Sequence, residues 1–131
     1  MRKLHYFHSV YRLECAGCGL YYLEEGTFNT MPALTRLNLA RNRLTGLPKG
    51  LLADMLSLRE LDLSDNMIGT LETNMFVGAT SLSKLNLAGN RLVALQVAPF
   101  LATPNLLRLD VSRCFLERVW NEARMPLKSL K

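Results

Sequence analysis

"LTRLNLARNRL" occupies residues 34–44, and two closely related stretches, "LRELDLSDNMI" at 58–68 and "LSKLNLAGNRL" at 82–92, restart the same pattern every 24 residues. The frame extends one period in each direction, to "VYRLECAGCGL" at 10–20 and "LLRLDVSRCFL" at 106–116. Positions 1, 4, 6 and 11 of every unit, and position 14 further on, are apolar when the cysteine of the first unit is counted. A fixed period of this length predicts a solenoid of stacked repeats.

The first half of each unit is predicted to be a short strand. Polar and apolar residues alternate over positions 3 to 7, so in the second unit Leu37 and Leu39 are expected to point into the core and Arg36 and Asn38 away from it. Stacking the units then makes a parallel sheet. An asparagine at position 9 is expected to bond the backbone of the buried turn and to form a ladder; these residues are Asn42, Asn66 and Asn90.

The second half of each unit is predicted to return the chain along the convex side. It carries Gly, Pro and small residues, as in "LPKGLLADMLS" at 47–57, which favour short helix or irregular structure. Position 19 is expected to close the core from this side with Phe28, Phe76 and Phe100, and with Leu52 in the second unit.

The repeat frame predicts the organisation of the whole chain. Residues 1–9 are the tail of an incomplete leading repeat, residues 10–126 hold five repeats that start at positions 10, 34, 58, 82 and 106, and residues 127–131 begin a truncated repeat. The terminal units lack polar caps for their apolar cross-sections. Self-association or fraying at these uncapped ends is therefore predicted.

This pattern resembles the leucine-rich repeat, LxxLxLxxNxLxxL followed by about ten residues. The 24-residue length with Phe at position 19 is similar to the extracellular "typical" class found in Toll-like receptors, Slit proteins and proteoglycans. The resemblance implies an α/β leucine-rich-repeat solenoid with a curved parallel sheet on the concave side and short helices or irregular segments on the convex side. It also implies that the chain is a fragment or truncated form of a longer protein.

The resemblance further implies a non-enzymatic protein–protein interaction module. The setting that it favours is an extracellular receptor, an adhesion protein or a secreted ligand-binding protein. The alternative is an intracellular scaffold, or an inhibitory subunit that docks on an enzyme. The chain has no Asn-x-Ser/Thr acceptor, and its first residues do not form a signal-peptide pattern. These two absences leave the intracellular alternative open. The resemblance favours a localisation at the cell surface or outside the cell, with the cytoplasm as the alternative.

Composition narrows the classes of partner. The 131 residues are 49% hydrophobic and 21% charged, as in one soluble globular domain. The net charge of +5 contains no run of like charges, so nucleic acid is not expected as a partner. The longest apolar tract, "LVALQVAPFLA" at 92–102, is shorter than the roughly 20 residues that cross a bilayer, so no membrane span is predicted within this chain.

The stretch "CAGC" raises the question of metal or redox chemistry. Cys15 falls at position 6 of its unit, whereas Cys18 and Cys114 fall at position 9, and all three are predicted to pack inward. Two alternatives stay open: a zinc site that adds His5 and His8, and a disulfide between Cys15 and Cys18. The leading interpretation includes no metal and no cofactor.

Catalysis is not predicted. Both histidines lie in the leading tail, so no Ser/His/Asp or Cys/His arrangement forms on ordered elements. The acids Glu14, Asp62 and Asp110 share position 5 with Asn38 and Asn86 in the intervening units, which places neighbouring acids about 9 to 10 Å apart. This spacing could suit an inverting pair of carboxylates, but a solvated ladder is the preferred interpretation.

Binding is expected on the concave surface, at the positions that the repeat leaves free, namely 2, 3, 5, 7 and 8. Position 7 is Ala or Ser in every unit, which predicts a shallow groove where a partner approaches the strands. Position 3 is mostly basic and position 5 is acidic or amide, a pattern that favours a protein ligand or co-receptor of mixed charge. The predicted partner-binding residues are Arg12, Glu14, Arg36, Asn38, Arg41, Glu60, Asp62, Asp65, Lys84, Asn86, Arg108, Asp110 and Arg113.

Overall fold

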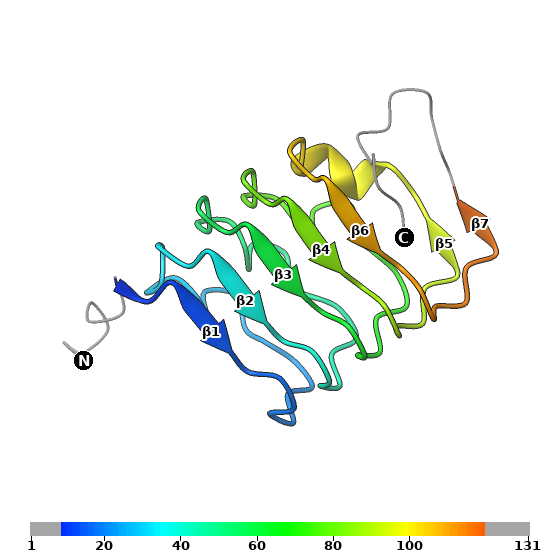
Figure 1. The fold of residues 1–131 in the computed structure, drawn as a ribbon, viewed down its shortest axis with the longest axis horizontal. Helices are drawn as coiled ribbons and strands as arrows, with labels where there is room; N and C mark the ends of the chain where they lie inside the picture. The colour runs from blue at the N-terminus through cyan, green and yellow to red at the C-terminus, as the bar shows by residue number, and fades with distance from the viewer. Residues whose placement is uncertain (1–8, 120–131) are drawn as a thin grey trace.

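The computed structural model describes residues 9–119, and their parallel strands confirm the predicted solenoid. The main sheet has five strands in the order β1-β2-β3-β4-β6 (Figure 1). Their bounds are β1 Arg12–Glu14, β2 Arg36–Asn38, β3 Glu60–Asp62, β4 Lys84–Asn86 and β6 Arg108–Asp110.

Each strand of the main sheet pairs in parallel with the strand one period away. Leu13 pairs with Leu37, and Leu37 pairs in turn with Leu61. The register therefore follows the predicted 24-residue frame from β1 to β6. A second parallel pair, β5 (Ala94–Leu95) and β7 (Arg118–Val119), lies at the C-terminal end of the solenoid. The predicted incomplete repeats at residues 1–9 and 127–131 lie outside the described residues, apart from Ser9.

The strands are shorter than the sequence predicted. They cover positions 3 to 5 of each unit, whereas the alternating pattern ran to position 7. The reason is a sharp turn at position 8, where the backbone of every unit enters the left-handed region, with φ of +66° at Gly17, +57° at Arg41, +55° at Asp65, +73° at Gly89 and +54° at Arg113. Backbone bonding between units nevertheless continues to this turn, because Arg41 N donates to Ser64 O at 2.9 Å.

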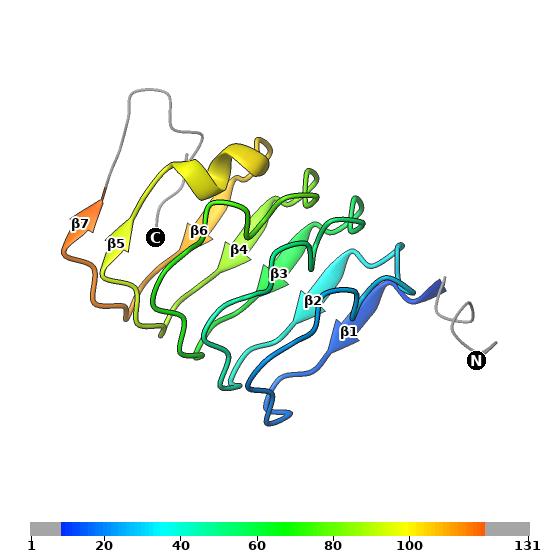
Figure 2. The same cartoon turned by 180° about the vertical axis from the view of Figure 1, so that it is seen from behind.

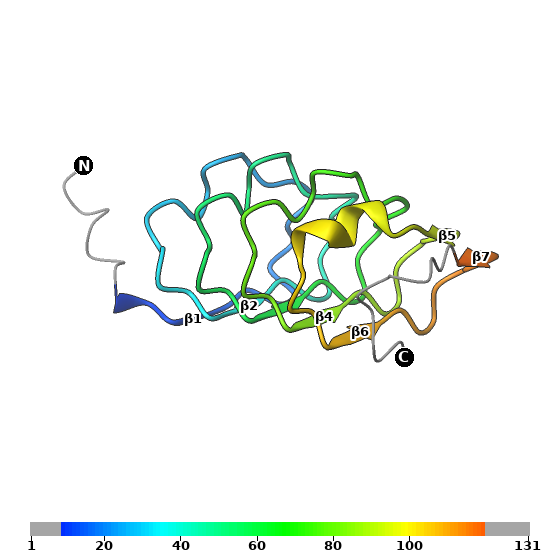
Figure 3. The same ribbon diagram turned by 90° about the horizontal axis from the view of Figure 1, so that it is seen from above.

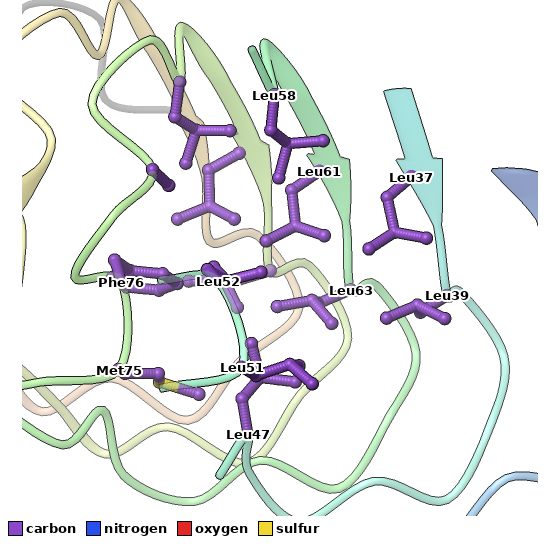
Figure 4. Packing of buried hydrophobic residues seen from close by; sticks show 14 of the residues in the cluster. Leu37, Leu39, Leu47, Leu51, Leu52, Leu58, Leu61, Leu63, Met75 and Phe76 are labelled. Carbon is purple, nitrogen blue, oxygen red and sulfur yellow. The ribbon is translucent and has the colours of Figure 1, made fainter. Parts of the chain in front are cut away.

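The core lies between the sheet and the return segments, as the sequence predicted. Leu37 and Leu39 are buried, and so are the position-19 residues of the first four units: Phe28, Leu52, Phe76 and Phe100. The rings of Phe76 and Phe100 stack with their centroids 5.8 Å apart. Figure 4 shows the leucines of successive strands pointing toward Leu52 and Phe76. Each unit therefore buries its apolar side against its neighbours.

The convex side is built from turns together with a short 3-10 helix, η2 (Ala98–Ala102), which has Pro99 in its first turn. Figures 2 and 3 show these return segments on the side opposite the main sheet. Residues 9–119 contain no α-helix. Of the two predicted forms of the convex side, irregular structure is therefore the main one.

The predicted asparagine ladder is confirmed in units 2 to 4. Asn66 is representative: its Oδ1 accepts from Leu44 N at 3.0 Å, and its Nδ2 donates to Leu39 O at 2.9 Å and to Leu63 O at 3.0 Å. Asn42 and Asn90 occupy the same place in their units. One side chain thus satisfies buried backbone groups of two adjacent units.

Replacing Asn66 with alanine is expected to lower the free energy of unfolding by about 1 to 3 kcal/mol, because buried backbone groups lose their partner. Urea denaturation followed by circular dichroism measures this change. Asn105→Ala is the matched control, since Asn105 is exposed and donates to Thr80 O at the surface. Its effect should stay within about 0.5 kcal/mol. Equal losses for the two variants would contradict the structural role of the ladder.

Candidate functional site

The concave face of the sheet holds a shallow groove of about 380 Å³. Its floor is the backbone of β2, β3, β4 and β6 at the position-4 leucines, whose side chains point into the core, and its walls are the side chains at positions 3 and 5. The predicted partner-binding residues that line it are Glu14, Arg36, Asn38, Glu60, Asp62, Lys84, Asn86, Arg108 and Asp110. The structure thus brings most of the predicted set together on one surface.

The position-3 side chains form a loose ionic row across the middle of the groove. Glu60 Oε2 lies 3.3 Å from Arg36 Nη2 and 3.9 Å from Lys84 Nζ. The side chains of Arg36, Glu60 and Lys84 are 47%, 34% and 52% exposed, so water screens both pairs. Exposed pairs of this kind contribute about 0 to 1 kcal/mol each to stability. The ionic row therefore contributes little to holding the fold together.

The position-5 side chains have a structural role that the sequence analysis missed. Asn38 Oδ1 accepts from Ala40 N at 2.9 Å, and Asp62 Oδ1 accepts from Ser64 N at 2.9 Å and from Ser64 Oγ at 2.6 Å. Asn86 makes the same contact with Ala88. The sequence contained a signal for this role, namely Asn or Asp at position 5. These residues commonly bond the backbone two residues ahead where a strand ends in a turn.

The aspartates of β3 and β6 share this arrangement. Asp110 Oδ1 accepts from the backbone and hydroxyl of Ser112, as Asp62 does from Ser64. One oxygen of each carboxylate is thus engaged in holding its own turn. In the first unit, Glu14 Oε1 instead accepts from Asn38 Nδ2 at 2.8 Å. These contacts agree with a ladder of polar side chains along the sheet.

The prediction for position 7 was wrong. Ala40, Ser64 and Ala88 are only 2%, 7% and 3% exposed, and they do not line the groove. They lie in the turn that follows each strand, where their carbonyl groups accept from position 8 of the preceding unit and their N–H groups donate to the position-5 side chain. Their small size is therefore a packing requirement and leaves no surface for a partner.

The predicted site residues at position 8 do not line the groove either. Arg41, Asp65 and Arg113 lie in the left-handed turn beyond the strands. Arg113 Nη1 donates to Asp65 Oδ1 at 2.9 Å, and the bond passes the intervening unit at Gly89, where a Cβ would collide with the Asp65 carboxylate. This hydrogen bond, and then the charge of Asp65, raises the pKa of Arg113. The position-8 residues form a separate edge of the molecule.

Arg12 also lies outside the groove. It is exposed on β1, the first strand of the main sheet, and is not among the lining residues. Arg41 is likewise exposed, and it has no ion pair within the described residues. The candidate site is therefore reduced to positions 3 and 5 of β2, β3, β4 and β6, with Glu14 at one end.

The cysteines only partly follow the prediction. Cys15 and Cys114 pack half-buried against the core, as predicted, whereas Cys18 is exposed, so the inward placement of Cys18 was wrong. Cys114 Sγ donates to Leu87 O at 3.3 Å and thus replaces the inter-unit bond of the ladder asparagines. The Sγ atoms of Cys15 and Cys18 are 2.7 Å apart.

The contact between the two thiols changes the acidity of Cys15. The hydrogen bond with Cys18, then burial, then the charge of Cys18 raise the pKa of Cys15 to about 11.

His5 and His8 lie outside the described residues, so the structure does not test the zinc hypothesis. Among the residues that the structure does describe, no three His, Cys, Asp or Glu side chains cluster as a metal site would require.

Comparison with known proteins identifies the repeat. The family model described as "Leucine rich repeat" matches residues 9–68 and 32–92. A chain of the Toll–Spatzle complex of Drosophila superimposes with a TM-score of 0.78 at 30% identity, over 83% of this chain and 14% of that one. No curated protein matches the sequence.

Two further solved structures share the fold. The leucine-rich repeat domain of APL1 gives a TM-score of 0.72 at 32% identity, over 83% of this chain and 28% of that one. The corresponding domain of APL1B gives 0.65 at 32% identity, over 72% and 27%. This chain thus spans less than a third of each of these three structures. No helix among the described residues has the length and apolar character needed to cross a membrane. With the family model covering the repeat frame from residue 9 to residue 92, the chain belongs to the leucine-rich repeat family.

Proposed function

We propose that this chain is a non-enzymatic protein-binding module of a larger extracellular or cell-surface protein, and that a protein ligand or co-receptor binds in the concave groove. The observation that carries the proposal is the groove itself, in which exposed cations lie beside partly exposed acids along a parallel sheet. The backbone beneath is held by inter-unit hydrogen bonds and by the asparagine ladder. Such a surface presents charges in a preformed geometry.

The charge pattern of the groove fits a partner of mixed charge. Position 3 offers Arg36, Lys84 and Arg108 on either side of Glu60, whereas position 5 offers acids and amides. A polyanion would meet the acidic row at every second unit. A protein segment that carries both signs matches the two rows at once, because neighbouring units present equivalent side chains about 4.8 Å apart.

The extracellular setting is supported by the class of repeat and by the structural relatives. One of them belongs to the Toll–Spatzle complex, a molecular hub in Drosophila development and innate immunity. The alternative setting is an intracellular scaffold. Surface biotinylation of cells that express the full-length protein distinguishes the two, since only a chain outside the membrane is labelled.

A photo-crosslinker placed in the groove tests the binding site. We expect benzoylphenylalanine in place of Lys84 to capture a partner of defined mass in cells that express the full-length protein. The same crosslinker in place of Glu72, an exposed residue of the convex return segment, is the control and should capture none. Capture only from position 72 would move the site to the convex side.

Charge reversal then measures the contribution of the groove. With the captured partner, Arg36→Glu combined with Lys84→Glu is expected to reduce the association rate constant about 10-fold at low salt and to weaken its salt dependence. Lys49→Glu, an exposed convex change of the same sign, should leave the rate constant unchanged. Thermal unfolding checks that the groove variant is folded. Unchanged kinetics in a folded groove variant would end the assignment of this site.

A further inference from the structure

The turn of the first unit differs chemically from the turns that follow it. In units 2 to 4 the position-9 asparagine donates to the position-6 carbonyl of its own unit, as Asn66 does to Leu63 O. In the first unit both positions are cysteine, and the Sγ atoms of Cys15 and Cys18 lie 2.7 Å apart. A disulfide needs about 2.05 Å between sulfurs, so the pair is within about 0.7 Å of bonding distance.

The backbone of this turn already holds the pair in place. Gly17, between the two cysteines, adopts the left-handed conformation with φ of +66° that every unit uses at this position. Cys15 N donates to Asn38 O at 2.8 Å, and Cys15 O accepts from Asn42 Nδ2 at 3.0 Å. Both partners belong to the second unit, so the solenoid fixes the backbone from which the Cys15 side chain reaches Cys18.

We propose that Cys15 and Cys18 are a modification site, at which an external low-molecular-weight disulfide such as oxidised glutathione converts the two thiols into an intramolecular disulfide. The bond would join position 6 to position 9 covalently, where the neighbouring units use an asparagine. The site lies at the N-terminal end of the sheet, and neither cysteine lines the groove, although Glu14, which precedes Cys15, forms one end of it.

The different exposure of the two thiols assigns their roles. Cys18 is exposed and Cys15 is half-buried. The thiolate of Cys18 attacks one sulfur of oxidised glutathione, which releases one glutathione thiolate and leaves a mixed disulfide on Cys18. Cys15 then loses its proton to solvent and attacks the Cys18 sulfur, which releases the second glutathione thiolate. The protons given up by the two cysteines are matched by those that the two glutathione thiolates take up.

The second step is helped by the first. The largest cause that raises the pKa of Cys15 to about 11 is its hydrogen bond with Cys18, and the charge of Cys18 also contributes. Once Cys18 carries glutathione, it can no longer become a thiolate beside Cys15, and its sulfur is a weaker acceptor for the proton that Cys15 donates. Cys15 therefore ionises more readily in the mixed disulfide than in the reduced protein.

Alkylation followed by mass spectrometry tests the proposal on the folded chain. After equilibration with oxidised glutathione, we expect one alkylated cysteine, Cys114, and a peptide that contains Cys15 and Cys18 with the loss of two hydrogens. After reduction, all three cysteines should be alkylated. Cys114→Ser is the matched control and should leave formation of the bond unchanged. In Cys15→Ser, the glutathione adduct should accumulate on Cys18.

The dependence on folding separates this site from any short Cys-x-x-Cys peptide. The equilibrium constant for the intramolecular bond against glutathione should be about 10-fold larger in the folded chain than in the same chain unfolded in urea. Circular dichroism of each variant confirms which state is measured. The proposal is overturned if three free thiols persist in oxidised glutathione, if the adduct on Cys18 persists while Cys15 is present, or if folded and unfolded chains give equal constants.

Discussion

Replacing Leu63 with alanine is expected to lower the free energy of unfolding by about 2 to 5 kcal/mol, because the change leaves a cavity in the middle of the core. Leu63 holds position 6 of the central unit and is 0% exposed. It belongs to the same buried cluster as Leu39, Leu51 and Leu52, and Figure 4 shows its side chain on the core side of the sheet, facing the return segment. In a solenoid the central unit supports interfaces on both sides, so the loss should extend to the neighbouring units.

The matched control is Leu56→Ala. Leu56 is 59% exposed on the convex side, and removal of its side chain should change stability by no more than about 0.5 kcal/mol. Urea denaturation of both variants gives the comparison. A loss below about 0.5 kcal/mol for Leu63→Ala would mean that position 6 does not face the core, and that the repeat register is wrong.

The buried half of this fold could be predicted because burial repeats along the chain. Each unit buries the same positions against its neighbours, so Leu37, Leu61 and Leu85 follow from spacing alone. The ladder asparagines follow for the same reason. A signal that recurs with one period does not depend on any single residue, which is why the core and the ladder are both confirmed.

The turns were harder to predict, because their geometry depends on contacts between units. Asp65 and Arg113 bond across a distance of two units, which a single-unit pattern does not contain. The left-handed turn at position 8 has a partial signal in the sequence, because two of the units have glycine there, Gly17 and Gly89. The burial of Ala40 has no such signal, because a small residue is equally compatible with a groove and with a tight turn.

The different structural roles of positions 3 and 5 decide which substitutions test binding most directly. Position 5 was predicted as a solvated ladder open to a partner, yet Asp62 and Asn38 also hold their turns through Ser64 and Ala40. Substitutions at position 5 would change binding and local structure together. Position 3 carries charged side chains whose ion pairs contribute little to stability. Substitutions of Arg36 and Lys84 therefore test the proposed binding with the smallest effect on the fold.

Replacing Gly78 with alanine is expected to lower the free energy of unfolding by about 2 to 5 kcal/mol, through a backbone collision combined with an unfavourable φ. Gly78 lies in the convex return of the third unit with φ of +102°. A Cβ there would lie 2.5 Å from Ala53 O and would also collide with Leu52 O, both in the backbone of the preceding unit. No rotamer change relieves a contact with backbone, so the two units must move apart.

Two other glycines separate the collision from the conformational cost. Gly17 also has a positive φ, but no atom lies within 4 Å of the place that a Cβ would take, so Gly17→Ala should cost only the left-handed strain, about 1 to 2 kcal/mol. Gly69 has neither feature, and Gly69→Ala should be neutral or stabilising by up to about 1 kcal/mol. Urea denaturation ranks the three variants. If Gly78→Ala costs no more than Gly17→Ala, the convex turns of neighbouring units are not in the close contact on which this stacking depends.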